Sequence, residues 1–354
     1  MESDISTQLQ SQVRAALESG TPLRIQGGGS KHFYGNRVTG EALDISGHRG
    51  IISYEPTELV LTARAGTPLK VIEHALNQQG QMLPFEPPHF GPDATLGGTI
   101  ATGLSGPRRP YTGAVRDYVL GLKLLTGHGE IVAFGGQVMK NVAGYDVSRL
   151  ATGSLGMLGI ILEVSLKVLP RPERETTITM PLSSSEAIEK LNQLRLLHTP
   201  LSAACCYQDT LWLRLSGTPR SVQSACARIG GDIRDEGESF WHDLREHTLP
   251  FFNSKQPLWR VSLAPNEPPA KLQGEVLIDW AGAQRWISTG APADIPRAYA
   301  NRRNGHATLF RNPESTTELR FHPLPDNLLA LHKNLKQAFD PSNLINPGVM
   351  YPTL

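Results

Sequence analysis

Three consecutive glycines near the amino terminus place the strongest constraint on how this chain can fold. Residues 23–26 have the apolar pattern of a short strand, and they run directly into Gly27, Gly28 and Gly29. Glycine has no Cβ, so the backbone can turn tightly there and bring several N–H donors close to one anion. Such a loop is typical of a phosphate site, although a simple flexible turn has the same composition.

The residues after the glycines favour the phosphate interpretation. Ser30 provides a hydroxyl donor and Lys31 a positive charge. A loop alone cannot bury the rings of a dinucleotide, so a second wall is needed, and the glycine-rich residues 95–106 are the candidate. The alternative for that segment is a tight turn between core strands. Neither glycine segment has the nicotinamide G-x-G-x-x-G pattern or the P-loop ending.

Charge and cysteine content exclude several classes of protein. The 354 residues suggest two domains, and 34 basic against 33 acidic side chains leave no electrostatic footprint for nucleic acid. Three cysteines, Cys205, Cys206 and Cys226, are too few for a four-thiolate iron–sulfur cluster and do not have metal-ligand spacing. We therefore expect no metal site, and any iron–sulfur centre belongs to another protein.

The sequence also predicts where the protein resides. Its acidic start lacks the basic and then apolar run of a secretory signal. The most apolar stretch, residues 155–169, is interrupted by Glu163 and Lys167 and is shorter than the ~20 residues that cross a bilayer. We expect a cytoplasmic protein that contacts the membrane at most peripherally.

Periodicity predicts a mixture of helices and strands. A helix over residues 5–17 should end at Gly20, and Thr67 and Pro68 should be the N-cap and first residue of another helix. Residues 95–170 have the glycine pattern of a sheet with close backbone approaches. After residue 170 the glycines thin, and helices over 185–197 and 219–229 flank a strand over 210–215. A final helix is predicted over residues 328–339.

Four segments in this order resemble FAD-binding domains of the vanillyl-alcohol-oxidase type. They are Gln26-Gly27-Gly28-Gly29-Ser30, residues 94–101, Gly144-Tyr145-Asp146 and residues 153–161. Further segments resemble the FAD-binding subunits of glycolate oxidases: residues 106–110, residues 134–136 and 139–146, Asp340-Pro341, and Asn346-Pro347-Gly348. This similarity extends over nearly the whole chain.

The resemblance implies an α+β fold, in which a two-subdomain FAD-binding module is joined to a smaller α+β cap domain. The implied ranges are 1–170 for the FAD-binding domain, split near residue 50, 171–320 for the cap, and 321–354 for a segment returning to the first domain. It further implies that FAD contacts Gln26, Gly27, Gly28, Gly29, Ser30, Lys31, Thr95, Gly97, Gly98, Ala101, Gly103, Ser105, Gly106, Gly153, Ser154, Gly156, Gly159, Ile160 and Ile161.

Two departures from related enzymes qualify the expected chemistry. Members that attach FAD covalently often have a histidine just after the glycines, where this chain has Ser30 and Lys31, with His32 one step further. FAD is therefore expected to bind without a covalent bond. Related 2-hydroxy-acid flavoenzymes also carry a C-terminal Gly-Asp-Gly-Asn type stretch with histidines for a metal and base site. This sequence lacks that stretch, which leaves independent catalysis open.

The function implied by the resemblance is that of the FAD-binding subunit of a glycolate dehydrogenase/oxidase complex. Such a complex oxidises glycolate, a 2-hydroxy acid, to glyoxylate and passes electrons through flavin to an iron–sulfur partner. A larger FAD-containing subunit would be the other partner and would hold the principal substrate site. Two alternatives stay open: an FAD-bearing assembly or scaffold subunit without its own turnover, and a stand-alone FAD-dependent alcohol oxidase.

No catalytic residue is assigned from the sequence. Arg108 and Arg109 could anchor a substrate carboxylate, since a guanidinium binds it in two places, or they could lie in a solvated turn or a subunit interface. His306 could be a base or a hydrogen-bonded structural residue. Core packing explains Cys205 and Cys206 more simply than a redox role does. Finally, four aromatic residues are expected either in the cap core or on an exposed contact surface: Trp241, Phe251, Phe252 and Trp259.

Overall fold

The computed structural model describes residues 2–136, 146–269, 272–312 and 318–354. The chain divides into two compact units. The first contains Met1–Leu104, Ala114–Pro170 and Pro323–Leu354, and the second contains Ser105–Gly113 and Arg171–His322. The short segment Ser105–Gly113 thus packs with the second unit, although residues of the first unit flank it in sequence. The resemblance assigns roles to its ranges, an FAD-binding domain and a cap, and this assignment stays a prediction.

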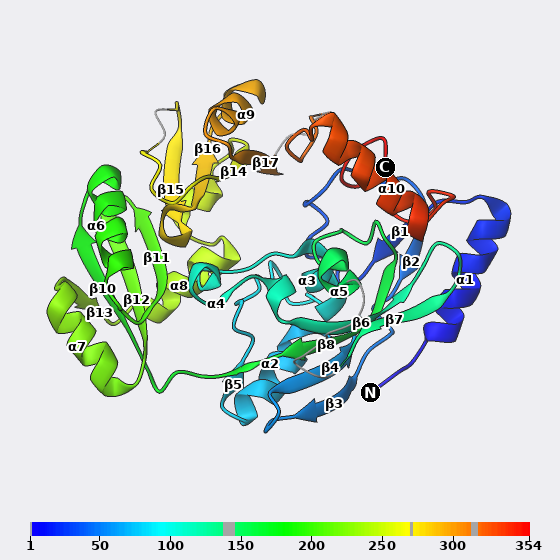
Figure 1. Cartoon of the computed structure of the whole chain (residues 1–354), viewed down its shortest axis with the longest axis horizontal. Helices are drawn as coiled ribbons and strands as arrows, with labels where there is room; N and C mark the ends of the chain where they lie inside the picture. Colours follow the sequence, from blue (N-terminus) through cyan, green and yellow to red (C-terminus); the bar gives the residue numbers. More distant parts are fainter. Residues whose placement is uncertain (1, 137–145, 270–271, 313–317) are drawn as a thin grey trace. The chain divides into compact units, whose positions relative to one another are not determined.

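A five-stranded antiparallel sheet forms the centre of the first unit (Figure 1). Its strand order is β3 (Ile51–Glu55), β4 (Val60–Arg64), β8 (Ile160–Lys167), β6 (Val119–Leu125) and β7 (Ile131–Gly135). The central strand β8 is buried on both faces apart from Glu163 and Lys167. A strand covered on both faces has a nearly continuous apolar sequence, which is the pattern seen here.

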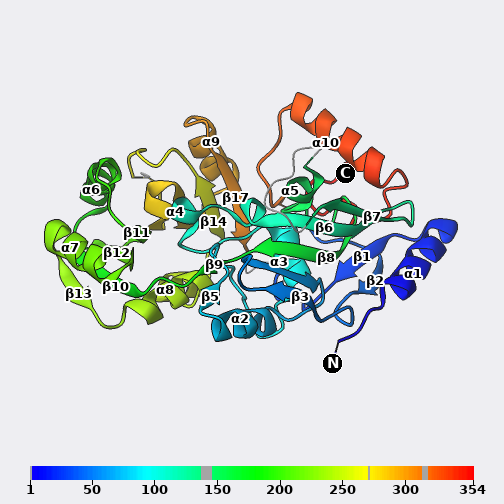
Figure 2. The same cartoon turned by 60° about the horizontal axis from the view of Figure 1, so that its bottom comes forward.

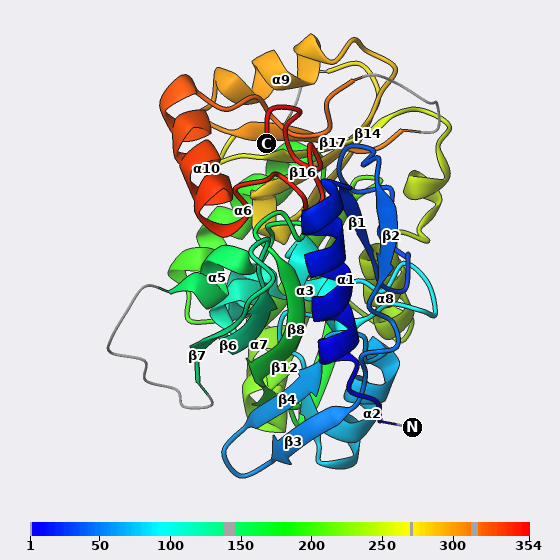
Figure 3. The same ribbon diagram turned by 90° about the vertical axis from the view of Figure 1, so that its right-hand side faces the viewer.

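A parallel pair of strands, β1 (Leu23–Gln26) and β2 (Glu41–Asp44), lies beside helix α1 (Ser6–Ser19) in the first unit (Figure 3). Helix α1 buries Leu9, Val13 and Ala16 in the same core as the five-stranded sheet. It ends at Gly20, whose φ of 68° is left-handed and needs a residue without a Cβ penalty. The helix and its stop were therefore predicted correctly.

The first unit contains five further helical segments and a short strand pair among its described residues. They are α2 (Leu69–Gln78), α3 (Leu96–Thr102), the 3-10 turn η1 (Val115–Asp117), α5 (Val147–Ala151), α10 (Asp326–Phe339), and β5 (Gln81–Met82) paired with β9 (Leu169–Pro170). The predicted cap of α2 is wrong by one residue, because Pro68 occupies the N-cap position. Thr67 instead bonds Gly50, accepting from its N–H at 2.9 Å and donating to its carbonyl at 3.2 Å.

Residues 96–102 form helix α3, so the alternative of a tight turn between core strands is wrong for them. Thr95 caps the helix, because its Oγ1 accepts a hydrogen bond from Gly98 N at 3.3 Å. Gly97 lies so close to β4's end that a Cβ there would be 2.8 Å from the Cβ of Ala65. Two glycines lower the helix propensity of this segment, but tertiary packing that needs their small size overrides the local preference.

The second unit is built on an eight-stranded antiparallel sheet (Figure 2). The strand order is β13 (Asp232–Arg234), β10 (Arg174–Pro181), β12 (Thr210–Gly217), β11 (Leu201–Tyr207), β15 (Glu275–Asp279), β16 (Gln284–Ser288), β14 (Leu258–Ser262) and β17 (His306–Arg311). The helices are α4 (Arg109–Thr112), α6 (Ser184–Leu196), α7 (Pro219–Ile229), α8 (Gly237–Glu246) and α9 (Asp294–Asn301), with 3-10 turns η2 (Pro250–Asn253) and η3 (Trp280–Gly282).

Two hydrophobic clusters hold the helices of the second unit against this sheet. Helices α6 and α7 pack on β10, β11, β12 and β15, and α9 packs on β14, β16 and β17. Trp241, Phe251 and Trp259 are buried, so of the two alternatives the exposed contact surface is wrong for these three. Cys205 and Cys206 are buried as well, in agreement with a packing role.

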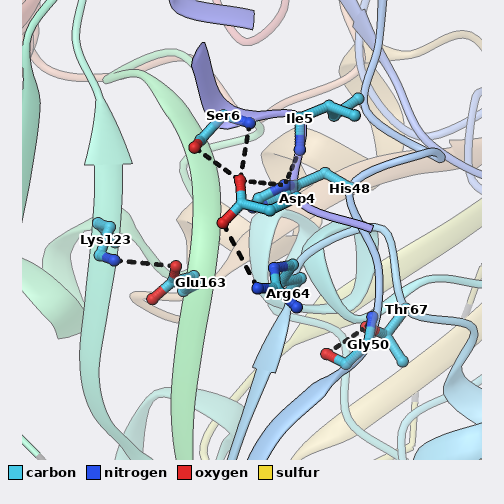
Figure 4. A network of polar contacts seen from close by, with 9 residues as sticks. All are labelled: Asp4, Ile5, Ser6, His48, Gly50, Arg64, Thr67, Lys123 and Glu163. Carbon is cyan, nitrogen blue, oxygen red and sulfur yellow. Dashed lines mark hydrogen bonds and ion pairs between the residues drawn. The ribbon is translucent and has the colours of Figure 1, made fainter. Parts of the chain in front are cut away.

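A polar network ties the start of the chain to the sheet of the first unit (Figure 4). Asp4 accepts two hydrogen bonds from Ser6 and lies 3.4 Å from the Arg64 guanidinium. His48 accepts a hydrogen bond from Ile5 N at 3.2 Å. The hydrogen bonds from Ser6 lower the pKa of Asp4 to about 2, so this carboxylate is charged at neutral pH.

Candidate cofactor site

The triple glycine forms a half-buried row of backbone donors at the end of β1. None of the described residues accepts a hydrogen bond from the backbone amides of Gly27, Gly28, Gly29 or Ser30. Gly29 has a φ of 73°, a left-handed conformation that turns successive amides toward one side. Unpaired amides in such a turn are the donors that a phosphate group requires.

Loop 27–30 is in direct contact with the segment that leads into α3. A Cβ on Gly28 would overlap the carbonyl oxygen of Asp93, and a Cβ on Gly27 would lie 2.9 Å from Thr95 Oγ1. The absence of a side chain at these two positions therefore allows the first and second glycine-rich segments to touch. The contribution of Asp93 was not recognised in the sequence, because a contact made by a carbonyl group has no side-chain signature.

The fourth motif, residues 153–161, packs on the other end of α3. Gly153 N donates to Ile100 O at 2.9 Å, and Leu155 N donates to Ala101 O at 2.8 Å. Gly103 comes so close that a Cβ there would be 3.0 Å from the Cα of Gly153. Helix α3 thus joins the phosphate-type loop at its start to the fourth motif at its end.

Two residues that were predicted to contact FAD are buried in the core around β8. Ile160 and Ile161 are the first residues of β8, pair with Leu125 and Leu124 of β6, and have buried side chains. Gly159 precedes them, and a Cβ there would be 2.8 Å from Leu125 O. Ser154 donates its hydroxyl to Ala151 O at 2.8 Å. A role of these residues toward a cofactor stays a prediction.

The Lys31 side chain is directed toward the residues around His89 and is shielded from solvent. Its side chain is buried, and Nζ donates to His89 O at 3.2 Å and lies 3.4 Å from Ser30 Oγ. It also lies 5.9 Å from the centre of the Phe90 ring. The ammonium group therefore stays next to Ser30 at the end of the glycine loop. Its hydrogen bond to His89 O attaches it to the same segment that contains Asp93.

The residues present fit a diphosphate-containing cofactor. The fit rests on the unpaired amides of residues 27–30 and on the close contact of Gly27 and Gly28 with Thr95 and Asp93, which leaves no room for a Cβ at either glycine. Thr99, in the middle of α3, adds a buried hydroxyl that has no hydrogen-bond partner among the described residues. Buried polar atoms without partners are rare in folded proteins and mark places where a ligand or water completes the structure.

The remaining candidate site residues, those for FAD contact and for substrate binding, belong to the second unit. Ser105 and Gly106 belong to it, and Gly106 O accepts from Trp280 Nε1 at 3.1 Å. Arg108 is buried and paired with Glu175, whose Oε2 also accepts from Ser216 Oγ at 2.5 Å. The solvated-turn interpretation of Arg108 is therefore wrong, because this guanidinium is buried and forms an ion pair with the more exposed Glu175.

Arg109 and His306 are also in the second unit. The Arg109 guanidinium lies over the Trp280 ring, 4.4 Å from its centre. His306 is the first residue of β17 and is exposed at the end of the strand. Partial desolvation and then the charges of Arg260, His322 and Arg109 lower its pKa. A role for either residue in substrate binding stays a prediction.

Part of the third motif lies outside the described residues. Residues 137–145, which include Gly144 and Tyr145, are not among them, while Asp146 caps α5 by accepting from Arg149 N at 3.1 Å. Among the described residues no group of three or more histidines, cysteines or carboxylates is arranged to hold a metal ion. Within the same residues, no helix has both the length and the apolar character required to cross a membrane.

Comparison with known proteins decides the family. A family of FAD binding domains matches residues 5–135. Glycolate oxidase subunit GlcE of Escherichia coli (strain K12) is 48% identical over 353 residues, which cover 100% of this chain and 99% of that protein. The chain belongs to the glycolate oxidase subunit GlcE family.

Other relatives of this GlcE-family protein match over a shorter stretch. D-2-hydroxyglutarate dehydrogenase of Xanthomonas citri pv. viticola is 33% identical over 137 residues, 39% of this chain and 29% of that enzyme. Glycolate oxidase subunit GlcD of Bacillus subtilis (strain 168) is 35% identical over 128 residues, 36% of this chain and 27% of that protein. The chain therefore spans less than a third of the length of these two relatives.

Solved structures show the same fold. Alkyldihydroxyacetonephosphate synthase superposes with a TM-score of 0.65 at 15% identity, covering 96% of this chain and 74% of that one. The predicted α+β fold with an FAD-binding module of the vanillyl-alcohol-oxidase type is confirmed, as are FAD as the cofactor and the class of FAD-dependent oxidoreductase.

Proposed function

We propose that this GlcE-family protein is the FAD-binding subunit of a glycolate dehydrogenase/oxidase complex that converts glycolate to glyoxylate. The observation that carries the proposal is the 48% identity to glycolate oxidase subunit GlcE, which extends over the full length of both chains. Bound FAD would accept the hydride that leaves C2 of the hydroxy acid. The protein's own contribution is to hold the cofactor through loop 27–30, α3 and residues 153–156.

The electrons would leave through an iron–sulfur partner, and a larger FAD-containing subunit would complete the complex. The chain has only three cysteines, Cys205 and Cys206 are buried in the second unit, and four thiolates are needed for a common iron–sulfur cluster. This supports placing the cluster in another protein. Purification of the complex, followed by flavin and iron counts for each subunit, tests the composition.

FAD is proposed to be held without a covalent bond. Ser30 and Lys31 follow the glycines, and neither forms the linkage that a histidine at that place makes in related proteins. Acid precipitation of the purified protein should release all the flavin into the supernatant. Flavin that stays with the precipitate would show a covalent link.

A second candidate function is an FAD-bearing assembly subunit that does not turn over substrate itself. It is supported by the sequence, which does not contain the Gly-Asp-Gly-Asn type stretch with histidines of related 2-hydroxy-acid flavoenzymes. Anaerobic addition of glycolate to the isolated FAD-loaded chain separates the two. Bleaching of the flavin absorbance supports catalysis in this subunit, whereas persistent oxidised flavin together with activity of the complete complex supports the assembly role. In a stand-alone alcohol oxidase, alcohols that lack a carboxylate would bleach the flavin absorbance without any partner protein.

The cellular location is proposed to be the cytoplasmic side, with any membrane contact made peripherally through the complex. Fractionation tests this location: the protein should leave the membrane fraction when high salt dissociates its partners.

A further inference from the structure

The C-terminal segment, residues 344–350, lies along β1 in the first unit (Figure 1). Leu23 N donates to Leu344 O at 2.7 Å, and Asn346 N donates to Leu23 O at 2.9 Å. The side chain of Asn346 continues this edge, because its Oδ1 accepts from Ile25 N at 2.8 Å. Asn346 is therefore attached to the strand that ends in loop 27–30.

The same side chain also holds the fourth glycine-rich motif. Asn346 Nδ2 donates to Leu155 O at 2.8 Å, and this amide is buried. Gly156 packs against this amide: a Cβ on Gly156 would be 3.0 Å from Asn346 Nδ2 and 2.7 Å from Ile25 Cδ1. One carboxamide thus bridges the strand before the phosphate-type loop and the loop before β8, using its acceptor on one side and its donor on the other.

The segment also holds the chain that leaves the glycine loop. Asn36 N donates to Val349 O at 2.8 Å, and Asn36 Nδ2 donates to Gly348 O at 3.1 Å and to Met350 O at 2.9 Å. Loop 27–30 is therefore attached to the C-terminal segment both before it, at Ile25, and after it, at Asn36.

A buried lysine fixes the segment to the rest of the unit. Lys336 Nζ donates to Ile345 O at 2.7 Å and to Met157 O at 2.9 Å. Lys336 on α10 thus anchors both the C-terminal segment, at the residue before Asn346, and the fourth motif. These contacts leave Asn346 little freedom to move without moving both loops.

We propose that residues 344–350 form part of the FAD site and that Asn346 is a positioning residue, which sets the separation of loop 27–30 from loop 153–156. A row of backbone amides binds an anion tightly only when it is held in place beforehand, since ordering the loops during binding reduces the affinity. The carboxamide of Asn346 supplies this order. Its effect is therefore on cofactor affinity, and it does not depend on whether glycolate is the substrate.

The backbone at Asn346 determines which replacement is informative. Its φ is 44°, in the left-handed region, where alanine is strained and glycine is not. Asn346→Gly removes both side-chain bonds without adding strain. Asn343 provides a matched control, because it has a φ of 48° in the same stretch of chain and its side chain is exposed.

The test compares FAD affinity and thermal stability of the full-length apoprotein. FAD is titrated and followed by flavin fluorescence, and unfolding of each apoprotein is followed by circular dichroism. We expect Asn346→Gly to raise the dissociation constant of FAD roughly tenfold or more relative to Asn343→Gly, because two buried hydrogen bonds are lost. The same loss should lower the unfolding midpoint of Asn346→Gly, so both FAD titrations are made at a temperature where each apoprotein is fully folded.

Two results would overturn the proposal. One is an FAD dissociation constant of Asn346→Gly equal to that of Asn343→Gly. The other is a lower unfolding midpoint with unchanged affinity, which indicates a structural role alone. If Asn346→Gly does not fold, Asn346→Asp decides, since aspartate can accept from Ile25 N but cannot donate to Leu155 O. Wild-type affinity in Asn346→Asp would then refute the role of the donor.

Discussion

Lys336 and Asp340 form an ion pair inside the first unit, with Nζ 2.7 Å from Oδ2 and side chains that are 5% and 0% exposed. The Asp340 carboxylate also accepts hydrogen bonds from Leu344 N at 2.9 Å and Ile345 N at 2.7 Å. This pair closes the turn between α10 and the C-terminal segment. Burial lowers the pKa of Lys336, although its bond to Asp340 opposes the shift.

Removing one member of this pair should be costly. Lys336→Met leaves the Asp340 carboxylate buried with backbone donors alone, so we expect a loss of about 3–5 kcal/mol in the free energy of unfolding. Urea unfolding followed by circular dichroism measures it. The exposed Lys333→Met is the control and should change stability by less than about 0.5 kcal/mol. Adding Asp340→Asn to Lys336→Met should recover part of the loss; a double variant that is less stable by the full sum would contradict the pairing.

Gly28 is expected to be irreplaceable for cofactor binding. In Gly28→Ala the new Cβ would overlap Asp93 O, which forces loop 27–30 and the segment before α3 apart. We expect the purified variant to contain little or no flavin, measured as the ratio of flavin absorbance to protein absorbance. Gly47→Ala is the control, because its Cβ would meet nothing closer than Ile5 Cδ1 at 3.4 Å. Full flavin content in Gly28→Ala would refute the assignment of the loop.

Arg108 should act on the stability of the second unit and leave FAD affinity unchanged. Its side chain is 6% exposed, whereas that of its partner Glu175 is 38% exposed, so solvent screens part of the interaction. We expect Arg108→Gln to cost about 1–2 kcal/mol in urea unfolding. The exposed Arg302→Gln in the same unit should have almost no effect. A large loss of FAD affinity in Arg108→Gln at unchanged stability would instead support a role near the cofactor.

Stability should fall as the pH drops below about 6.5. The His247 ring is stacked on Phe252 at 3.9 Å, and burial together with Arg311 and Arg260 lowers its pKa well below the usual value. Burial also lowers the pKa of His48, although Asp4 opposes the shift. Because both folded-state pKa values are depressed, the unfolded chain takes up protons first, and each histidine weakens the fold by up to ~1.4 kcal/mol per pH unit below that point.

Urea midpoints at pH 7.5 and pH 5.5 test this dependence, since these values lie on either side of the usual histidine pKa. His247→Phe keeps an aromatic ring in the stack and cannot be protonated. We expect the difference between the two midpoints to shrink in this variant. An unchanged difference would assign the pH dependence to other groups.

Features that depend on local chemistry could be predicted from the residues alone. The strand before Gly27, the stop of α1 at Gly20, and the buried stripe of α2 follow from side-chain periodicity and from the conformational freedom of glycine. The order of the glycine-rich motifs was sufficient for the FAD-binding family, because each motif is contiguous in the chain. A contiguous motif can be read without knowledge of contacts.

How these motifs meet depends on contacts between residues far apart in the chain. Asp93 reaches Gly28 through a backbone carbonyl, and Asn346 reaches Ile25 across 321 residues of chain, so neither contact leaves a pattern in the sequence. The glycine-rich segment after Thr95 became helix α3 because packing on Ala65 outweighs the weak helix propensity of glycine. The ion pair of the buried Arg108 with Glu175 also depends on tertiary structure, because Glu175 comes close only after the second unit has folded.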